Sequence, residues 1–221
     1  MTLPRTVPPI DAHTPDVLET ATFALGCFWG PDARFGVVPG VVRTRVGYTG
    51  GSTPKPTYHD LGQHTEAIQI DYDPAAISYN DLLHIFWQAH NPIAQAYSRQ
   101  YQNIIFTHDE TQERQAVAMR DAVAAGINGT VRTQIRALDV FYRAEDYHQK
   151  FHLRHVPEVM GDFEQIYPDG PGFVDSTAAA RANGFVSGYG RLSVLLEEID
   201  EYGLSSRAAD KLTEMARRFD H

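Results

Sequence analysis

The stretch Gly26-Cys27-Phe28-Trp29-Gly30 holds the only cysteine in 221 residues. It follows an apolar run at 21–25 and leads into Pro31 and Asp32, which suit the first turn of a helix. The pattern predicts that Cys27 lies where a buried strand passes into a helix N-terminus. Because a helix N-terminus carries partial positive charge, we expect it to favour the thiolate. A lone cysteine is more often an inert core residue, but these glycines and aromatic neighbours favour a reactive thiol.

The composition predicts a folded, acidic protein. Hydrophobic residues make up 43% of the chain and charged residues 21%, which allows a core and argues against disorder. The net charge of −9 argues against a nucleic-acid-binding surface, which would be basic. One cysteine cannot form an internal disulfide, and neither a signal peptide nor a membrane-spanning apolar run is evident. We therefore expect a cytoplasmic protein that binds neither nucleic acid nor membrane.

Hydrophobic periodicity predicts an α+β fold, with helices packed on one face of a small sheet. Strands are expected at 21–25, 41–48, 66–72, 103–106 and 133–138, and helices at 32–38, 78–89, 109–125 and 144–152. Beyond a Pro- and Gly-rich segment at 168–172, helices are expected at 175–182, 190–202 and 205–219. The first twenty residues contain four prolines and are expected to form an extended arm.

Cysteine chemistry requires a thiolate, a proton donor or acceptor for the leaving group, and a pocket. Glu66 is the leading acid candidate because it begins an apolar strand, where burial raises the pKa of a carboxyl group. Tyr58 and Tyr101 can each point a hydroxyl into a cleft. From composition alone, a surface glutamate and packing tyrosines are the commoner situations.

Two other kinds of site are weaker candidates. His148, His152 and His155 recur at i, i+4 and i+7 on one helix face, with Glu145 nearby. No ligand from a second segment is evident, so we expect no metal. A cysteine hydrolase that uses a histidine and Asn91 stays open, because spacing does not decide it.

The residues around Cys27 resemble the signature of the A-type peptide methionine sulfoxide reductases. The resemblance covers about residues 20–168. It divides the chain into an N-terminal arm (1–20), a catalytic domain (21–168) and a helical C-terminal extension (169–221). Further segments resemble the family in the family's order: 39–41, 46–51, 54–58, 64–68, 73–74, 100–101 and 144–149.

The resemblance implies a ferredoxin-like βαββαβ core with a mixed or antiparallel sheet. It also implies reduction of the S epimer of methionine sulfoxide, free or in peptides. Cys27 would be the nucleophile, left as a sulfenic acid when methionine departs. Glu66 would protonate the sulfoxide oxygen, and Tyr58 and Tyr101 would donate hydrogen bonds to it. Phe28 and Trp29 would form the apolar pocket for the S-methyl group.

This chain departs from the family in three respects. The resolving cysteines near the family's C-terminal end are absent, so an external thiol would have to reduce Cys27: thioredoxin, glutaredoxin or a small-molecule thiol. No bound cofactor is expected. The family's Asp at the substrate site is Asn91 here, and two nearby segments are shorter. An alternative therefore stays open, namely a thiol sensor or a thioether- or sulfoxide-binding protein without turnover.

Overall fold

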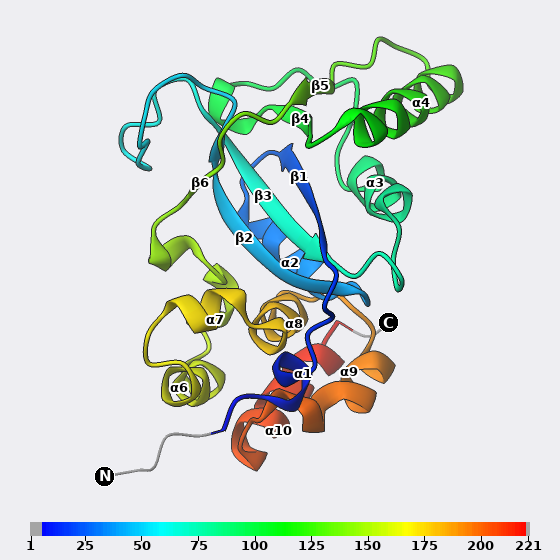
Figure 1. The fold of residues 1–221 in the computed structure, drawn as a ribbon. Helices are drawn as coiled ribbons and strands as arrows, with labels where there is room; N and C mark the ends of the chain where they lie inside the picture. The colour runs from blue at the N-terminus through cyan, green and yellow to red at the C-terminus, as the bar shows by residue number, and fades with distance from the viewer. Residues whose placement is uncertain (1–5, 220–221) are drawn as a thin grey trace.

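The computed structural model describes residues 6–219, and one six-stranded mixed sheet organises it (Figure 1). The strand order is β5-β4-β1-β3-β2-β6. Strand β5 is parallel to β4, and the other neighbouring pairs are antiparallel. The α+β class predicted from the sequence is confirmed, with β6 as an unpredicted edge strand. The bounds are β1 Glu19–Leu25, β2 Val41–Thr49, β3 Thr65–Tyr72, β4 Asn103–Thr107, β5 Gln134–Ala137 and β6 Tyr142–Arg143.

Three helices share one hydrophobic core with the sheet: α2 (Trp29–Gly36), α3 (Tyr79–Gln88) and α4 (Glu110–Gly126). Phe23 of β1 lies in this core, with its ring centroid 5.7 Å from Phe35 of α2 and 5.0 Å from Phe86 of α3. Helix α3 begins at a capping box, in which the Ser78 hydroxyl accepts from the backbone N–H of Asp81. The core therefore fixes α2, which follows Cys27, against the central strands.

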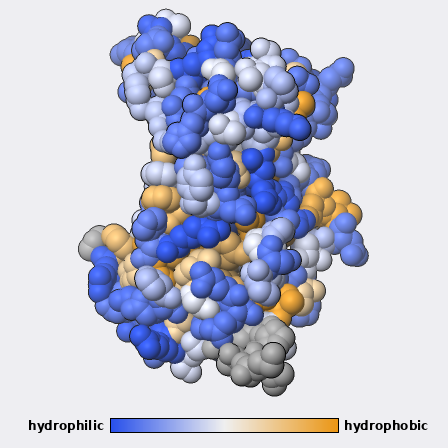
Figure 2. Space-filling view, turned by 90° about the vertical axis from the view of Figure 1, so that its left-hand side faces the viewer, coloured by the Kyte–Doolittle hydropathy of each residue, from blue (hydrophilic) through white to orange (hydrophobic). Residues whose placement is uncertain are grey.

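The remaining helices pack below the sheet in Figure 1 around a second hydrophobic core. This core joins residues on both sides of residue 168, since the ring centroids of Phe163 and Phe173 are 5.8 Å apart. On the face shown in Figure 2 the surface is largely hydrophilic, and apolar atoms gather in its middle. The bounds are α1 Pro9–Ala12, α5 Phe151–Arg154, α6 Pro157–Ile166, α7 Pro171–Asp175, α8 Thr177–Val186, α9 Leu192–Glu198 and α10 Ser206–Arg217, with 3₁₀ turns η1 Arg99–Tyr101, η2 Asp146–His148 and η3 Ile199–Tyr202.

The N-terminal arm is less extended than the sequence predicts. Residues 9–12 form α1, and the last two residues of the arm belong to β1; the first five lie outside the described residues. The Asp11 carboxylate accepts hydrogen bonds from the backbone N–H groups of Thr177 and Ala178, at 2.6 and 3.1 Å, at the start of α8. A carboxylate at a helix N-terminus is stabilising, so this contact ties the arm to the C-terminal helices.

Three predicted helices need correction. The helix expected at 175–182 is α8, which runs from Thr177 to Val186 after the separate helix α7 has ended at Asp175. Helix α2 runs from Trp29 to Gly36 rather than over 32–38. The helix predicted at 144–152 is broken, because Lys150 takes a left-handed backbone conformation (φ 53°) between η2 and α5. His148 and His152 therefore do not share a continuous helix face. Within residues 6–219, no group of three or more His, Cys, Asp or Glu side chains could hold a metal ion. No helix in the same range is long and apolar enough to cross a membrane.

Candidate active site

Cys27 lies in the turn between β1 and α2, as predicted. Strand β1 ends at Leu25, Gly26 adopts φ 87°, and α2 begins two residues after Cys27, at Trp29. A positive φ is accessible to glycine without the strain that a Cβ would cause. This turn presents Cys27 as an exposed residue at the end of a buried strand.

The thiol of Cys27 is less acidic than the sequence predicts. Loss of hydration raises its pKa above the ordinary value even though the residue is exposed. A hydrogen bond from the backbone N–H of Trp29 opposes this rise, while the nearby negative charge of Glu66 adds to it. The local helix terminus acts in the predicted direction, but partial desolvation outweighs it. Cys27 is therefore mostly a thiol at neutral pH, and its thiolate is a minor, more nucleophilic form.

Glu66 is a buried carboxyl group held beside Cys27. It is 1% exposed in β3, and its Oε2 accepts from the backbone N–H of Phe28 at 3.0 Å. Its Oε1 accepts from Nε2 of Gln100 at 2.7 Å. Burial raises the pKa of Glu66, while these two hydrogen bonds lower it, and the net direction is upward. A carboxyl group with a raised pKa retains its proton closer to neutral pH and can act as a general acid.

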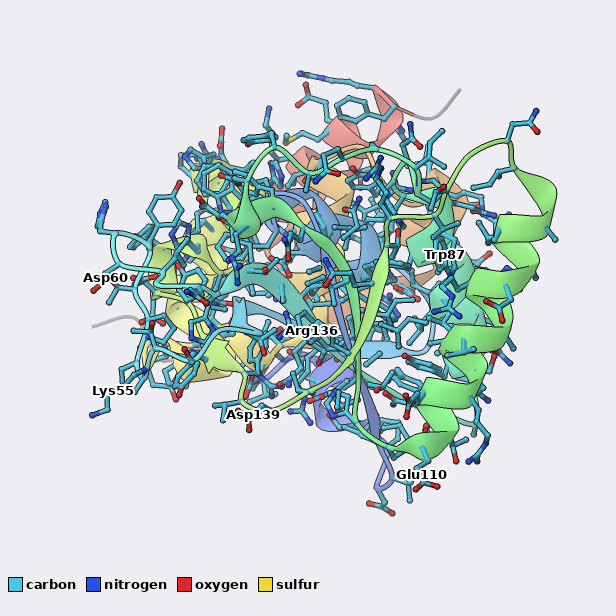
Figure 3. The ribbon with its side chains drawn as sticks, turned by 90° about the horizontal axis from the view of Figure 1, so that it is seen from above. Lys55, Asp60, Trp87, Glu110, Arg136 and Asp139 are labelled. Atoms are coloured by element: carbon cyan, nitrogen blue, oxygen red, sulfur yellow. The ribbon has the colours of Figure 1, made fainter. Side chains whose placement is uncertain are left out.

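Tyr101 lies near the carboxyl group of Glu66, and the ring of Tyr58 lies against His148, with ring centroids 4.7 Å apart. Desolvation and the charges of Glu66, Tyr58 and Cys27 all raise the pKa of Tyr101, so its hydroxyl stays protonated and can donate a hydrogen bond. Tyr58 belongs to the loop between β2 and β3, and its backbone N–H donates to Oε1 of Glu145 at 3.0 Å. Figure 3 shows Lys55 and Asp60 of this loop on one side of the molecule, opposite Glu110 at the start of α4.

Aromatic side chains surround His148, which sequence reasoning did not place at this site. Its ring centroid lies 5.1 Å from that of Phe28, 4.7 Å from Tyr58 and 4.1 Å from Tyr147. Its Nδ1 accepts from the indole N–H of Trp29 at 3.2 Å. Burial lowers the pKa of His148, which favours the neutral ring that this hydrogen bond requires.

Gln100 and Glu145 are further site residues that sequence reasoning left without a role. Gln100 donates to Glu66, and Glu145 accepts from the Tyr48 hydroxyl at 2.8 Å as well as from the backbone of Tyr58. Both residues fall in segments that carry the family resemblance, at 100–101 and 144–149. Their place in these segments was the one feature of the sequence that could have pointed to a role at the site. Their hydrogen-bond partners lie on other strands and loops, which the sequence does not show.

Asn91 is exposed, and its side-chain oxygen accepts from the backbone N–H of Ile93 at 3.1 Å. This is a local contact that stabilises the turn after α3. It does not link Asn91 to Cys27 or Glu66. The role expected for Asn91 in substrate binding therefore stays a prediction from the resemblance.

Comparison with known proteins decides the family. A family model described as "Peptide methionine sulfoxide reductase" matches residues 19–164. The chain belongs to the peptide methionine sulfoxide reductase family. The peptide methionine sulfoxide reductase of Drosophila melanogaster is 36% identical over 189 residues, which cover 84% of this chain and 75% of that protein. The A5 reductase of Oryza sativa subsp. japonica is 35% identical over 209 residues, covering 90% and 76%.

Two solved structures have a similar fold. Methionine sulfoxide reductase A of Corynebacterium diphtheriae is 30% identical, with a TM-score of 0.57 over 71% of this chain and 84% of that chain. Reduced Mxr1 from Saccharomyces cerevisiae has a TM-score of 0.59 at 24% identity, over 66% of this chain and 89% of that chain, and supports the fold alone.

Proposed function

We propose that this peptide methionine sulfoxide reductase converts the S epimer of methionine sulfoxide, free or peptide-bound, to methionine at the expense of an external thiol. The observation that carries the proposal is the placement of Glu66. Its buried carboxyl group accepts from the backbone N–H of Phe28, directly after the exposed Cys27. The thiol nucleophile follows the end of β1 and the carboxylic acid lies near the start of β3. Because these two central strands are antiparallel neighbours, both groups lie at the same edge of the sheet.

The proposed reaction follows from these two groups. The thiolate sulfur of Cys27 attacks the sulfoxide sulfur, and the neutral carboxyl group of Glu66 gives its proton to the sulfoxide oxygen. The oxygen is a poor leaving group unless it is protonated, so the acid is needed as the sulfur–oxygen bond breaks. The hydroxyl group passes to the Cys27 sulfur as the sulfur–oxygen bond breaks, and the sulfur–sulfur bond formed in the attack breaks with its electron pair going to the substrate sulfur. Methionine leaves with its sulfur reduced by two electrons, and Cys27, oxidised by two electrons, is left as a sulfenic acid.

The neighbouring side chains take supporting roles in this proposal. Tyr58 and Tyr101 donate hydrogen bonds to the sulfoxide oxygen, which is supported by the raised pKa of Tyr101 and its electrostatic coupling to Glu66. Trp29, which is partly exposed, provides apolar surface for the S-methyl group. Phe28 is assigned to the same pocket on the resemblance; it is 1% exposed and packs against Tyr48. Asn91 is assigned to substrate binding on the resemblance alone.

The chain requires a reductant from outside. Cys27 is its only cysteine, so the sulfenic acid cannot be resolved as an internal disulfide. A thioredoxin, a glutaredoxin or a small-molecule thiol would attack the sulfenic sulfur, release water and then exchange with a second thiol. The single cysteine is also what supports the expected cytoplasmic location, where thiols stay reduced.

We also propose that β1-α2-β2-β3-α3-β4 is a ferredoxin-like βαββαβ core. The spatial order β4-β1-β3-β2 with antiparallel neighbours supports this assignment. The match of the family model to residues 19–164 supports a catalytic domain at 21–168, preceded by the arm at 1–20 and followed by the helical extension at 169–221.

A turnover assay on both sulfoxide epimers tests the proposed function. With dithiothreitol present, we expect continuous formation of methionine from the S epimer and none from the R epimer, and thioredoxin is to be compared as reductant. No product from the S epimer, together with measurable binding of the sulfoxide, would instead support the sensor or binding protein. Ester hydrolysis that does not depend on a reductant would indicate the cysteine hydrolase.

A further inference from the structure

We infer that the C-terminal extension is part of the active-site scaffold: Asn183 of α8 acts with Asp32 and Lys150 as a buried positioning unit for Trp29. This inference rests on the proposed function, in which Trp29 contacts the substrate's methyl group. None of the three residues touches substrate in that reaction. They act through the segment that holds the indole ring.

Asp32 lies at the centre of the unit. It is fully buried in α2, three residues after Trp29. Its Oδ1 accepts from Nζ of Lys150 at 3.2 Å, and its Oδ2 accepts from the backbone N–H of Lys150 at 3.0 Å. Lys150 is also fully buried, and its Nζ donates further to the backbone oxygen of Thr44 at 2.6 Å. Buried charges are tolerated only when they are paired and hydrogen-bonded, so this pair restricts both segments to one arrangement.

Lys150 lies in sequence between two residues whose rings contact the indole of Trp29, His148 and Phe151. His148 accepts the indole N–H at 3.2 Å, and the Phe151 ring stacks on the indole with centroids 3.6 Å apart and planes 6° apart. The left-handed backbone of Lys150 (φ 53°) is the bend that brings both side chains to the indole. Because Asp32 accepts both the backbone N–H and the ammonium group of Lys150, it fixes this bend.

Asn183 joins the unit from the extension. It is 0% exposed in α8, and its Nδ2 donates to Oδ2 of Asp32 at 3.2 Å. Its Oδ1 accepts from the backbone N–H of Leu153 at 3.0 Å, in the same short helix as Phe151. One amide group therefore connects α2, which carries Trp29, to α5, which stacks on it.

Helix α8 is built to approach α2 closely. A Cβ at Gly184 would lie 2.5 Å from the carbonyl oxygen of Ala33, and one at Gly36 would lie 2.5 Å from the carbonyl oxygen of Ala180. The Arg181 guanidinium also donates to the backbone oxygen of Gly36 at 3.0 Å, at the end of α2. Every residue of α8 is buried. The extension thus holds α2 at its middle and at its C-terminal end.

The substitution Asn183→Ala tests the inference in a Trp87→Phe background, where Trp29 is the only indole in the chain. Trp87 lies on α3, beside α4 and far from the loop that carries Lys55 and Asp60 (Figure 3). Thr177→Val is the matched control, because it removes one buried hydrogen bond from α8, to the backbone oxygen of Val42, without touching α5. Two quantities are measured: acrylamide quenching of Trp29 fluorescence, and the sulfoxide concentration that gives half the maximal single-turnover rate.

Asn183→Ala removes the hydrogen bond to Asp32 and the one from the backbone of Leu153. We expect stronger quenching of Trp29 and a rise of roughly three- to tenfold in the half-saturating sulfoxide concentration. The maximal rate should change less, and Thr177→Val should leave both quantities at the background values. Unchanged quenching with Asn183→Ala, or an equal change with Thr177→Val, would overturn the inference.

A second variant covers the case in which Asn183→Ala does not fold. The pair Asp32→Asn and Lys150→Met removes both buried charges together, and we expect it to increase quenching of Trp29 as well. Quenching identical to the background protein would contradict the positioning role. Because fluorescence needs no turnover, an inactive wild-type protein would overturn the proposed function and leave this test decisive for the inference.

Discussion

Replacing Cys27 by serine is expected to abolish methionine formation. A serine hydroxyl is almost fully protonated at neutral pH, and its oxygen cannot form the sulfenic acid through which the sulfoxide oxygen is accepted. The substitution should otherwise be mild, because Cys27 is exposed and its side chain fills no core position. We expect the free energy of unfolding to change by less than about 0.5 kcal/mol, as for most surface substitutions.

The measurement for Cys27→Ser is methionine released from the S epimer with excess dithiothreitol, alongside a denaturant unfolding curve for each protein. An unchanged unfolding midpoint shows that the loss of activity is chemical. Methionine formation at the wild-type rate by the folded variant would remove Cys27 from its role as nucleophile.

Replacing Glu66 by glutamine is expected to slow the chemical step by roughly a hundredfold or more, the usual contribution of a positioned general acid. Glutamine keeps the size of the side chain and can still accept the hydrogen bond from the backbone of Phe28, but it has no acidic proton to give. Glu113→Gln on α4 makes the same chemical change at an exposed position and should leave the rate unchanged.

The pH dependence of the single-turnover rate separates this role from a structural one. Below the raised pKa of Glu66 the acid is protonated, and the rate rises with pH as the Cys27 thiolate accumulates. Between the pKa of Glu66 and the higher pKa of Cys27, the gain in thiolate is cancelled by the loss of acid, and the rate is flat. In Glu66→Gln only the thiolate titrates, so the rate should keep rising through that range.

A Glu66→Gln rate within about twofold of the wild type, or a pH profile with the same flat region, would show that another group supplies the proton. Tyr101 would then be the next candidate, because its hydroxyl is protonated over the whole range and is coupled to Cys27.

The features that depend on neighbouring residues in the sequence could be predicted. The turn that presents Cys27 follows from an apolar run and a glycine, and the start of α3 follows from the capping residue Ser78. The apolar strand that follows Glu66 makes it a candidate for a buried acid, although composition alone favours a surface glutamate, and the structure buries it. Each of these depends on local periodicity, capping or turn chemistry, which a single sequence contains.

The features that depend on distant partners could not be predicted. Local spacing favours a continuous helix through 144–152, yet Asp32, 118 residues away, holds Lys150 in a left-handed conformation that breaks it. The predicted stabilisation of the Cys27 thiolate used only the helix terminus, whereas desolvation by packed neighbours and the charge of Glu66 reverse the net shift. Asn183 lies just beyond the helix predicted at 175–182, and its partners in α2 and α5 become apparent only in the folded structure.

In the proposed reaction one thiol, Cys27, holds the whole reducing capacity of the chain, and the yield of methionine in the absence of any reductant tests this most directly. Fully reduced protein, freed of all added thiol and mixed with excess S epimer, should release about one methionine per chain and then stop. The reason is that one thiol can become one sulfenic acid. Each further addition of dithiothreitol should restart the reaction. Many methionines per chain without a reductant, or none from a protein that binds the sulfoxide, would contradict the account.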